Sequence, residues 1–571
     1  MTMLDESLID TTPAAPTGTP RLRVRDLSVG FEGSAGVRSV VRSVSFDLHA
    51  GRCVAIVGES GSGKSVTART LVGLTGVGGV VTGGEVALGE RDLRNRSSRS
   101  WRRIRGREIG FIQQDALVSL DPLRPVGAEI EEALRLHGWR DRRARRAKAI
   151  DVLTSVGVPD AERRARQRAG ALSGGLRQRA LIASAVALDP AVIIADEPTT
   201  ALDVTVQAQV LSLLAEMKDR GASILLISHD LAVVGELADE ILVMSRGEVV
   251  EQGPAARVLR DPQHPYTQAL LDAVPGGHTR GERLAPATAS VPDLHIAATS
   301  RAAHGDLNAP VLEARGLVRH FIGRDGSRTR AVDGVSFTLQ RGETLGIVGE
   351  SGSGKSTTAR IALALEDADE GEVTLLGHPW SAVPESRRRH LRDRIAVVYQ
   401  DPLSSFDPRW SVERILLDAI PSGAGVDQAQ RRERVQALLG QVALGPEVRG
   451  RSPLRLSGGQ RQRVAIARAL AASPEIIVLD EAVSALDVSV QAQILDLLVQ
   501  LQDDYGLSYL FISHDLGVIH HMSDRVLVMT NGRVVESGTS DEIFARPQHP
   551  YTQQLIGSLP SPDLLERKAS A

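Results

Sequence analysis

The sequence predicts an α/β protein of two tandem domains, each with a mixed β-sheet core and an inserted helical subdomain. Two observations predict this fold class. The segment from Arg21 to Leu270 recurs in order from Val311 to Leu555, which indicates an internal duplication. Within each copy, short β-branched runs that end in polar residues alternate with helix-prone stretches, a pattern typical of mainly parallel sheets.

Four strings carry the duplication. They are GESGSGKS at 58–65 and 349–356, LSGGLRQR at 172–179 with LSGGQRQR at 456–463, ISHDL at 227–231 and 512–516, and QHPYTQ near the end of each copy. Because all four return in the same order, each copy is expected to fold as a complete domain.

The chain divides by composition into two domains, a linker and two tails. Residues 275–310 are rich in Ala, Pro and Gly with little apolar periodicity, so they predict a flexible linker. The N-terminus is acidic and rich in Pro and Thr, which predicts a disordered tail and not a secretory signal. The expected boundaries are a tail at 1–20, domains at 21–274 and 311–560, the linker at 275–310 and a tail at 561–571.

Composition excludes several classes of protein. With 67 basic and 70 acidic residues among 571, the net charge of −3 argues against binding nucleic acid through bulk electrostatics. Cys53 is the single cysteine, so the chain has no internal disulfide framework and no cluster that needs four cysteines, which fits a reducing cytoplasm. The apolar runs are a few residues long where a membrane span needs about 20, so transport would require a separate membrane partner.

Local patterns place the elements within each copy. The runs CVAIVGES, AVIIADE and SILLISHD, and later TLGIVGES, EIIVLDE and YLFISHD, predict buried parallel strands with polar residues at their carboxyl ends. The stretch from Glu129 to Arg168 is rich in Arg and helix-prone, and its charges are expected on solvated helix faces. Near the end of each copy, an Arg-Gly or Asn-Gly pair between two apolar runs predicts a hairpin.

A glycine-rich loop that binds phosphate follows the first strand of each copy. The pattern G-x-x-x-x-G-K-S lets backbone N–H groups surround phosphate, while the lysine reaches the β and γ phosphates and the serine hydroxyl ligates Mg²⁺. The loop residues are Gly58, Glu59, Ser60, Gly61, Ser62, Gly63, Lys64 and Ser65, and in the second copy Gly349, Glu350, Ser351, Gly352, Ser353, Gly354, Lys355 and Ser356.

An Asp-Glu pair closes a later strand in each copy, at Asp196-Glu197 and Asp480-Glu481. The Asp is placed to hold Mg²⁺, and the Glu to orient and deprotonate the water that attacks the γ-phosphate. The histidines of the two ISHDL strings, His229 and His514, end the next strand and are expected to donate to γ-phosphate oxygens.

The LSGG strings predict helix entrances that bind an anion. Ser173 and Ser457 are positioned to cap a helix, and two following glycines let the backbone approach phosphate. The glycines are Gly174, Gly175, Gly458 and Gly459.

The LSGG string shortly before the carboxylate strand, present twice, resembles the signature of the ATP-binding-cassette (ABC) family of P-loop NTPases. The resemblance covers nearly all of both copies and implies ATP and Mg²⁺ as ligands. It implies that Gln114 and Gln400 touch Mg²⁺ and the attacking water, and that they relay site closure to a membrane partner. The implied metal ligands are then Ser65, Gln114 and Asp196 in the first copy, and Ser356, Gln400 and Asp480 in the second. Phe31 and Phe321 correspond to the family's adenine-stacking aromatic, with a plain core Phe as the alternative.

Within that family, the DPLSSFDP element and the two QHPYTQ segments resemble the dipeptide/oligopeptide importer ATPases. The likeness implies uptake of a peptide or related solute, with nickel chelates and glutathione left open. Two integral-membrane permease subunits and an extracytoplasmic solute-binding protein are the implied partners, with the chain peripheral at the cytoplasmic face of the inner membrane. The alternatives are a twin-cassette protein acting on the ribosome and an ATPase that mends DNA; the linker composition and the absence of zinc-ligand cysteines weigh against them.

Two further expectations concern how the copies work together. Head-to-tail pairing, as in the family, would join the first phosphate loop to Ser457, Gly458 and Gly459, and the second loop to Ser173, Gly174 and Gly175. The first signature has Leu176 where the second has Gln460, but the serine and both glycines are kept, so both sites are expected to be active.

Overall fold

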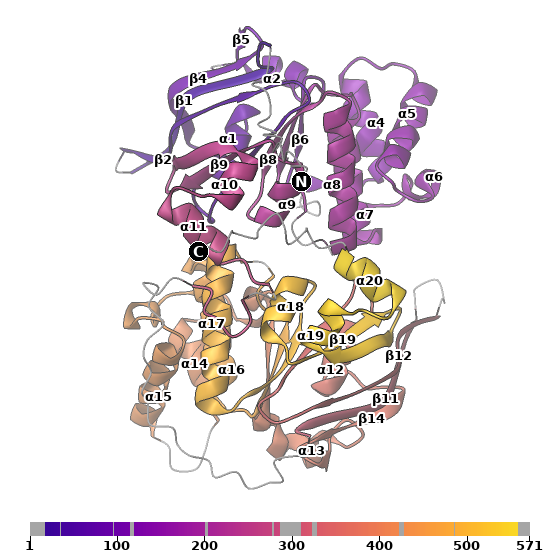
Figure 1. The fold of residues 1–571 in the computed structure, drawn as a ribbon, viewed down its shortest axis with the longest axis vertical. Coiled ribbons are helices and arrows are strands. Elements are labelled where there is room, and N and C mark those ends of the chain that lie inside the picture. Colours follow the sequence, from indigo (N-terminus) through magenta and orange to yellow (C-terminus); the bar gives the residue numbers. More distant parts are fainter. Residues whose placement is uncertain are drawn as a thin grey trace, which may run out of the picture.

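The computed structural model describes residues 18–557 except 35, 95, 115–118, 200–201, 203, 277–278, 286–309, 323–327, 422–426 and 485. Figure 1 shows two halves stacked along the long axis, and both follow the same order of strands and main helices. The first half runs from β1 to α11 and the second from β11 to α20. The predicted fold class, two tandem α/β domains with mixed sheets, is confirmed. The tails at 1–17 and 561–571 lie outside the described residues.

Each half contains two sheets. The order of the six-stranded sheet is β10-β9-β3-β8-β7-β6 in the first half and β16-β17-β18-β13-β19-β20 in the second, parallel except for the terminal hairpin. The four-stranded sheets, β2-β1-β4-β5 and β12-β11-β14-β15, are antiparallel. The three runs predicted as buried parallel strands in the first half are β3, β7 and β8, and those in the second half are β13, β17 and β18, so the strand predictions are confirmed.

The elements of the first half are β1 Leu22–Gly33, β2 Gly36–Leu48, β3 Cys53–Val57, α1 Lys64–Leu71, β4 Gly79–Leu88, β5 Arg91–Asp92, α2 Ser98–Ile104, β6 Ile109–Ile112, α4 Val126–Leu136, α5 Arg142–Ser155, α6 Ala161–Arg164, α7 Gly174–Val186, β7 Val192–Asp196, α8 Val204–Asp219, β8 Ser223–Ile227, α9 Leu231–Leu237, β9 Glu240–Ser245, β10 Glu248–Pro254, α10 Ala255–Arg260 and α11 Pro265–Asp272.

The elements of the second half are β11 Leu312–Ile322, β12 Arg328–Leu339, β13 Thr344–Val348, α12 Lys355–Ala362, β14 Glu370–Leu375, β15 His378–Pro379, α13 Glu385–Arg388, β16 Ile395–Tyr399, α14 Val412–Ala419, α15 Gln428–Gln441, α16 Gly458–Leu470, β17 Ile476–Asp480, α17 Val488–Tyr505, β18 Ser508–Ile512, α18 Leu516–Met522, β19 Arg525–Thr530, β20 Arg533–Thr539, α19 Ser540–Ala545 and α20 Pro550–Gly557.

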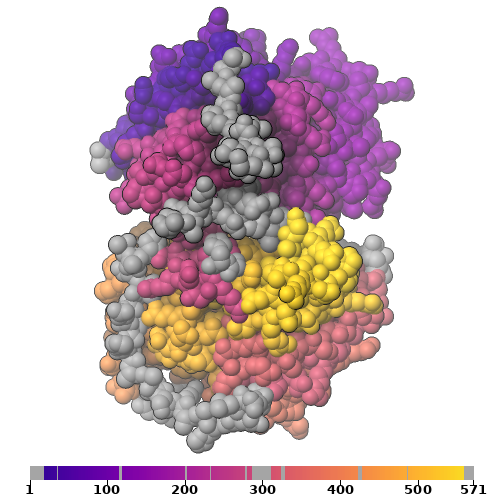
Figure 2. Space-filling model, viewed as in Figure 1, coloured from indigo at the N-terminus to yellow at the C-terminus, as the bar shows by residue number. Residues whose placement is uncertain are grey.

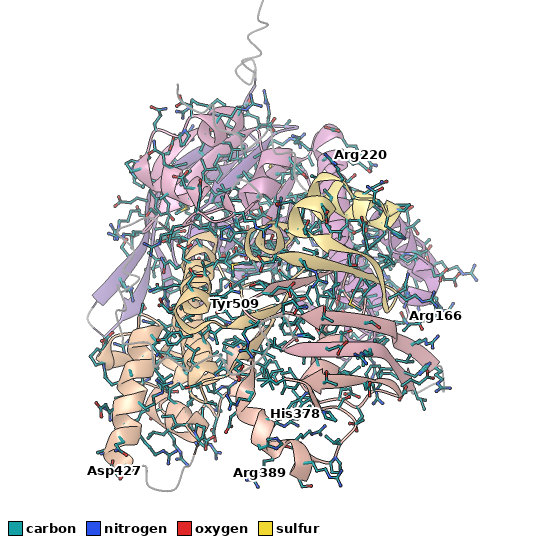
Figure 3. The ribbon with its side chains drawn as sticks, turned by 60° about the horizontal axis from the view of Figure 1, so that its bottom comes forward. Arg166, Arg220, His378, Arg389, Asp427 and Tyr509 are labelled. Atoms are coloured by element: carbon teal, nitrogen blue, oxygen red, sulfur yellow. The ribbon has the colours of Figure 1, made fainter. Side chains whose placement is uncertain are left out.

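The helix-prone stretch forms a lateral helical subdomain of α4, α5 and α6, matched in the second half by α14 and α15 (Figure 1). Its charged side chains lie on the solvent side, as expected: Arg166 is paired with Glu162 one turn away, and both remain more than 60% exposed. Figure 3 shows Arg166 and Arg220 at the periphery, whereas Tyr509 on β18 is fully buried and donates to the Leu498 carbonyl. No helix among the described residues has the length and apolar character that a membrane crossing requires.

The predicted hairpins connect β9 to β10 and β19 to β20. Their central pairs, Arg246-Gly247 and Asn531-Gly532, all have positive φ, as a tight two-residue hairpin turn demands. Each turn also reaches the phosphate loop of its own half: Gly247 N donates to Ser62 O at 3.0 Å, and Gly532 N to Ser353 O at 3.0 Å. The hairpin therefore fixes one side of the loop.

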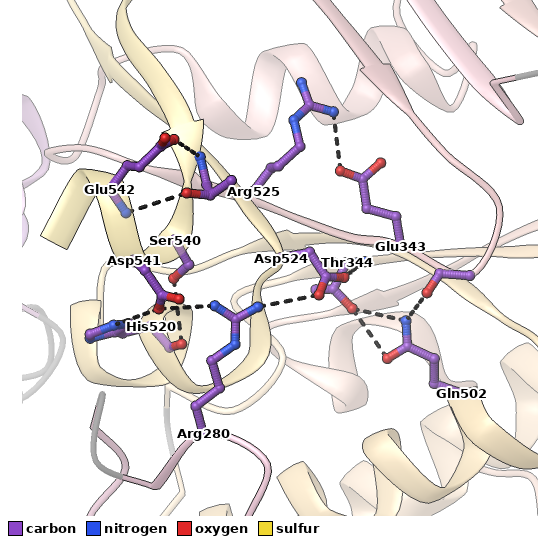
Figure 4. Close-up of polar contacts among 12 residues, drawn as sticks. Arg280, Glu343, Thr344, Gln502, His520, Asp524, Arg525, Ser540, Asp541 and Glu542 are labelled. Atoms are coloured by element: carbon purple, nitrogen blue, oxygen red, sulfur yellow. Dashed lines mark hydrogen bonds and ion pairs between the residues drawn. The ribbon is translucent and has the colours of Figure 1, made fainter. Parts of the chain in front are cut away.

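The described part of the expected linker is packed against the second half, although its composition predicted flexibility. Arg280 forms ion pairs with Asp524 and Asp541, as Figure 4 shows. Further along, the Asp496 carboxylate on α17 accepts the backbone N–H groups of Leu284 at 3.0 Å and Ala285 at 2.9 Å. In Figure 2 the magenta end of the first half continues between the orange and yellow surfaces of the second. These contacts give residues 279–285 a fixed course that low apolar periodicity did not reveal.

Candidate active site

The phosphate loop of each half leads directly into a helix, α1 or α12. At Gly58, φ is +143° and a Cβ would lie 2.1 Å from the Met244 carbonyl oxygen, so the loop needs glycine there. Gly63 caps α1 without a side-chain acceptor, as Gly354 caps α12. The backbone N–H groups of the first turn are therefore not used by a capping side chain, and a helix N-terminus in this state suits phosphate.

The loop lysines point back into their loops. Lys64 Nζ donates to the carbonyl oxygens of Gly58 at 2.6 Å and Glu59 at 2.9 Å. Lys355 makes the same two bonds, to Gly349 and Glu350, at 2.7 and 2.8 Å. Burial lowers the pKa of Lys64, while the carboxylates around it, with Asp487 the foremost, oppose that shift. Each ammonium group is thus held in the center of the loop, where phosphate would bind.

The metal-binding pair predicted in each half is formed. Ser65 Oγ donates to Asp196 Oδ1 at 2.8 Å, and Ser356 Oγ to Asp480 Oδ1 at 3.1 Å. Asp196 Oδ2 is buried with no hydrogen-bond partner among the described residues and has only Arg69 Nε at 3.9 Å. Burial raises the pKa of both aspartates.

A buried carboxylate oxygen without a hydrogen bond, beside a hydroxyl, fits Mg²⁺, which prefers oxygen ligands and takes the rest from phosphate and water. The described residues contain no group of three or more His, Cys, Asp or Glu side chains that would hold a metal by themselves. The residues present therefore fit an ion bound together with a nucleotide.

The glutamates predicted to be catalytic each contact the two side chains that the sequence grouped with them. Glu197 Oε2 accepts Gln114 Nε2 at 2.7 Å and lies 3.4 Å from His229 Nδ1. In the second half, Glu481 Oε2 lies 2.8 Å from Gln400 Nε2 and 3.4 Å from His514 Nδ1. The three residues closely follow the carboxyl ends of β6 or β16, β7 or β17, and β8 or β18, which meet at one edge of the sheet.

The histidine and glutamate perturb each other's ionisation. Burial alone would lower the pKa of His514, but its hydrogen bond to the Glu481 carboxylate and the charge of that group outweigh burial and raise it. Burial in turn would raise the pKa of Glu481, and His514 lowers it instead. The pKa of His229 is raised in the same way, against burial, by Glu197. An ionised glutamate is the form that accepts a proton from water.

The signature serines cap their helices as predicted. Ser173 Oγ accepts Leu176 N at the start of α7, and Ser457 Oγ accepts Gln460 N at the start of α16. Only the second entrance has a full capping box, because Gln460 Oε1 also accepts Ser457 N at 3.2 Å and Leu176 has no such group. A Cβ on Gly459 would lie 2.5 Å from Val490 of α17, so glycine permits this close approach.

Each phosphate loop contacts the other half. Ser489 Oγ, at the start of α17, donates to Glu59 Oε1 at 2.6 Å, and Thr205 Oγ1, at the start of α8, donates to Glu350 Oε1 at 2.8 Å. Asp487 accepts a backbone hydrogen bond from Ser60, and its charge acts on Lys64.

Sequence reasoning missed Ser489, Thr205 and Asp487. The only available signal was the string TTALD or VSALD, which follows each catalytic pair in both copies. The described bonds of Ser173 and Ser457 lie within their own helix entrances, so the pairing of each signature with the opposite loop stays a prediction.

The two aromatic residues expected at adenine lie at strand ends, outside the apolar cores. Phe321 is 42% exposed, and the Arg319 guanidinium lies 5.3 Å from its ring centroid. Phe31 is partly exposed near Gly76. The alternative of a plain core Phe does not match these positions, and stacking on adenine stays a prediction.

Comparison with known proteins places the chain in a family. The family model described as "ABC transporter" matches residues 41–200 and 332–484, and the one described as "Oligopeptide/dipeptide transporter, C-terminal region" matches 250–300 and 535–570. The chain therefore belongs to the ABC transporter family of ATP-binding proteins, with the oligopeptide/dipeptide transporter region present twice.

Three relatives resemble the chain over nearly its whole length. The "Glutathione import ATP-binding protein GsiA" of Pectobacterium atrosepticum is 43% identical, covering 96% of this chain and 90% of the relative. The "Oligopeptide transport ATP-binding protein OppD" of Mycobacterium tuberculosis is 41% identical, covering 96% and 100%. The "Peptidoglycan transport ATP-binding protein YejF" of Agrobacterium fabrum is 42% identical, covering 96% and 98%. The similarity to each relative thus extends over both halves of the chain.

Proposed function

We propose that this chain is the ATP-hydrolysing subunit of an importer, coupling ATP binding and hydrolysis to uptake of peptides or a related small solute such as glutathione. The observation that carries the proposal is the duplicated Gln-Glu-His arrangement at the phosphate loops, combined with the oligopeptide/dipeptide transporter region in both halves. The printed names of the three relatives, for glutathione, oligopeptide and peptidoglycan transport, support the class of solute.

The residues of each half divide the chemical work. The lysine and the N–H groups of the loop bind the phosphates, and the Ser-Asp pair would hold Mg²⁺, which would neutralise developing phosphate charge. The glutamate, Glu197 or Glu481, accepts the proton of the attacking water. Its glutamine and histidine neighbours keep the carboxylate in one orientation, and the histidine is also placed to donate to the γ-phosphate as charge develops.

We further propose that two integral-membrane permease subunits and an extracytoplasmic solute-binding protein complete the transporter, with this chain bound peripherally at the cytoplasmic face of the inner membrane. Gln114 and Gln400 would pass opening and closing of the sites to the permeases, because each lies at the junction of the sheet edge and the helical subdomain.

Transport in a reconstituted system tests the proposal. Proteoliposomes are prepared with this chain and with the permeases and binding protein that genes next to its own encode. They should accumulate a labelled tripeptide or glutathione only with Mg-ATP on the side of this chain. The matched control replaces the chain by the Glu197→Gln, Glu481→Gln variant, which should give no accumulation. Equal uptake with the variant, or recovery of the native chain with ribosomes and not with membranes, would overturn it.

A further inference from the structure

The tyrosine of each QHPYTQ segment bonds to a phosphate loop. Glu59 N donates to the Tyr266 hydroxyl at 3.0 Å, and Glu350 N donates to the Tyr551 hydroxyl at 3.0 Å. The two contacts arise independently in the two halves, from tyrosines more than 200 residues from their partners. A contact repeated at equivalent positions is part of the construction of the site and not an accident of one surface.

Hydrogen bonds to the terminal hairpin fix the segment that carries each tyrosine. In the first half the Glu251 carboxylate on β10 accepts the N–H groups of Gln263 at 2.9 Å and His264 at 3.1 Å. His264 Nδ1 then accepts Tyr266 N at 3.1 Å and so caps α11. The same set of hydrogen bonds recurs in the second half.

There Glu536 accepts Gln548 N at 2.7 Å and His549 N at 3.0 Å, and His549 Nδ1 accepts Tyr551 N at 3.1 Å. The QHPYTQ segment is therefore anchored to the same hairpin whose turn contacts the phosphate loop. Its tyrosine extends that support to a second point of the loop.

The bonded N–H belongs to the first peptide unit of the loop. The carbonyl of Gly58 and the N–H of Glu59 share one peptide plane and point in opposite directions. Tyr266 holds the N–H side, and Lys64 Nζ binds the carbonyl side at 2.6 Å. The side chain of the same Glu59 accepts Ser489 from the other half. Glu59 thus connects the QHPYTQ segment of its own half, the loop lysine and the opposite half.

We propose that Tyr266 and Tyr551 are positioning residues for ATP binding: each hydroxyl fixes the first peptide of its phosphate loop and so sets the place of the loop lysine and of the glutamate that contacts the other half. The proposal rests on ATP binding at these loops. It gives the QHPYTQ segments a role inside the nucleotide site.

The chemistry of the hydroxyl suits this role. Burial raises the pKa of Tyr266 to about 12, although the bond from Glu59 N opposes the shift, so the group stays neutral at physiological pH. A Tyr→Phe change therefore removes one acceptor without removing a charge or the ring. It leaves the N–H of Glu59 without that partner.

Nucleotide binding by Tyr266→Phe and Tyr551→Phe tests the proposal. In the double variant, the Kd for Mg-AMP-PNP and the KM for ATP should each rise about tenfold, the usual effect of losing the acceptor of a partly buried donor, while kcat changes less than about twofold. Each single variant should weaken one site only. Tyr505→Phe is the matched control, because its hydroxyl accepts Gln441 Nε2 at 2.7 Å far from either loop. It should leave Kd and KM unchanged.

A double-mutant cycle tests the link to the other half. Tyr266→Phe and Ser489→Ala act on the same Glu59, so their effects on Kd should be non-additive, whereas Tyr266→Phe with Thr205→Ala, which acts on Glu350, should be additive. Native affinity in the Tyr266→Phe, Tyr551→Phe variant, or a loss equal to that of Tyr505→Phe, would overturn the proposal. A native chain that binds no nucleotide would instead overturn the proposed function.

Discussion

The two glutamates proposed to be catalytic have an unusual backbone. Glu197 and Glu481 both have φ of 52°, the left-handed region that non-glycine residues rarely occupy. Their N–H groups donate to Ile227 O and Ile512 O at 2.9 Å, which pins each residue to the neighbouring strand. Strain repeated at the same position of both halves is typical of a functional site, because only surrounding contacts keep it in place.

Replacing both glutamates by glutamine should separate ATP binding from hydrolysis. Glu197→Gln with Glu481→Gln keeps the loop, the lysine and the Ser-Asp pair but removes the proton acceptor, so the hydrolysis rate should fall at least about a hundredfold with ATP still bound. Phosphate release and equilibrium ATP binding measure the two quantities. Near-native hydrolysis by the variant would remove these residues from the catalytic role.

The pKa of His514 should depend on Glu481. Hydrogen–deuterium exchange of histidine rings, followed by mass spectrometry across pH, should give a lower pKa for His514 in Glu481→Gln than in the native chain, because the variant loses the hydrogen bond and the charge that oppose the effect of burial. Glu475→Gln, which removes a carboxylate paired with Arg341 and Arg394, is the matched control and should leave that pKa in place. An unchanged pKa in Glu481→Gln would contradict the pairing.

The pH dependence of folding stability follows from the directions in which the pKa values of His514 and Glu481 are shifted. The raised pKa of His514 means that its contribution is full below the unfolded-state pKa and is lost as pH rises through the folded-state value. The lowered pKa of Glu481 means that its contribution is present above the unfolded-state pKa and is lost as pH falls through the folded-state value. The pair therefore stabilises the second half fully between the unfolded-state pKa of the glutamate and that of the histidine, and progressively less as pH moves beyond them towards the folded-state values.

At the scale of single elements, the entrances of the two signature helices, LSGGLRQR and LSGGQRQR, differ at one position. Both α7 and α16 begin at a capped serine, but α16 has in addition the Gln460 side chain on the Ser457 N–H. The difference comes from Leu176, which packs partly buried against an apolar cluster that contains residues of both halves. The first signature thus exchanges one capping bond for apolar contact, while the serine and glycines keep their geometry.

Reciprocal substitutions should move the stability of the two helix entrances in opposite directions. Leu176→Gln should slow amide exchange over residues 174–177 about two- to fivefold, equivalent to about 0.5–1 kcal/mol for the added capping bond. Gln460→Leu should speed exchange over 458–461 by a similar factor. Exchange measured by mass spectrometry checks both, and shifts of the same sign in both variants would contradict the capping account.

At the scale of the whole molecule, the halves are joined in two ways. Each phosphate loop takes a hydroxyl from the other half, Ser489 or Thr205, and residues 279–285 fasten the end of the first half to the second through Arg280 and Asp496. The reciprocal loop contacts support a head-to-tail arrangement, because each half presents the start of α8 or α17 to the other's loop. The signature helices α7 and α16 pack against these same segments.

A bulky signature residue should therefore disable the opposite site. Ser457→Arg places a long side chain at the entrance of α16, so hydrolysis should be lost at the Lys64 site, while Ser173→Arg should act on the Lys355 site. A crosslinkable ATP analogue, with the labelled peptides assigned to each loop, reports hydrolysis at the two sites separately. If Ser457→Arg affects only the Lys355 site, each half works on its own nucleotide and the shared-site prediction is wrong.

The sequence by itself determined the duplication and the strands, and it grouped the side chains that each half brings together at its phosphate loop. These follow from local patterns. A strand such as β7 is predicted by its apolar run, and the Asp196-Glu197 pair is recognised by its place at the end of that run. Gln114, Glu197 and His229 meet because parallel strands bring their carboxyl ends to one edge, which topology fixes once the strands are known.

Only the tertiary structure decided which segments from distant parts of the chain support those sites. The bonds of Glu59 to Tyr266 and Ser489 span 207 and 430 residues, and the Arg280 ion pairs belong to a segment whose composition predicted flexibility. Such contacts depend on side chains that carry no periodicity of their own. Their partners are chosen by the packing of complete halves, because a single hydrogen bond of about 1 kcal/mol orders a segment only where the surrounding fold already holds its partner in place.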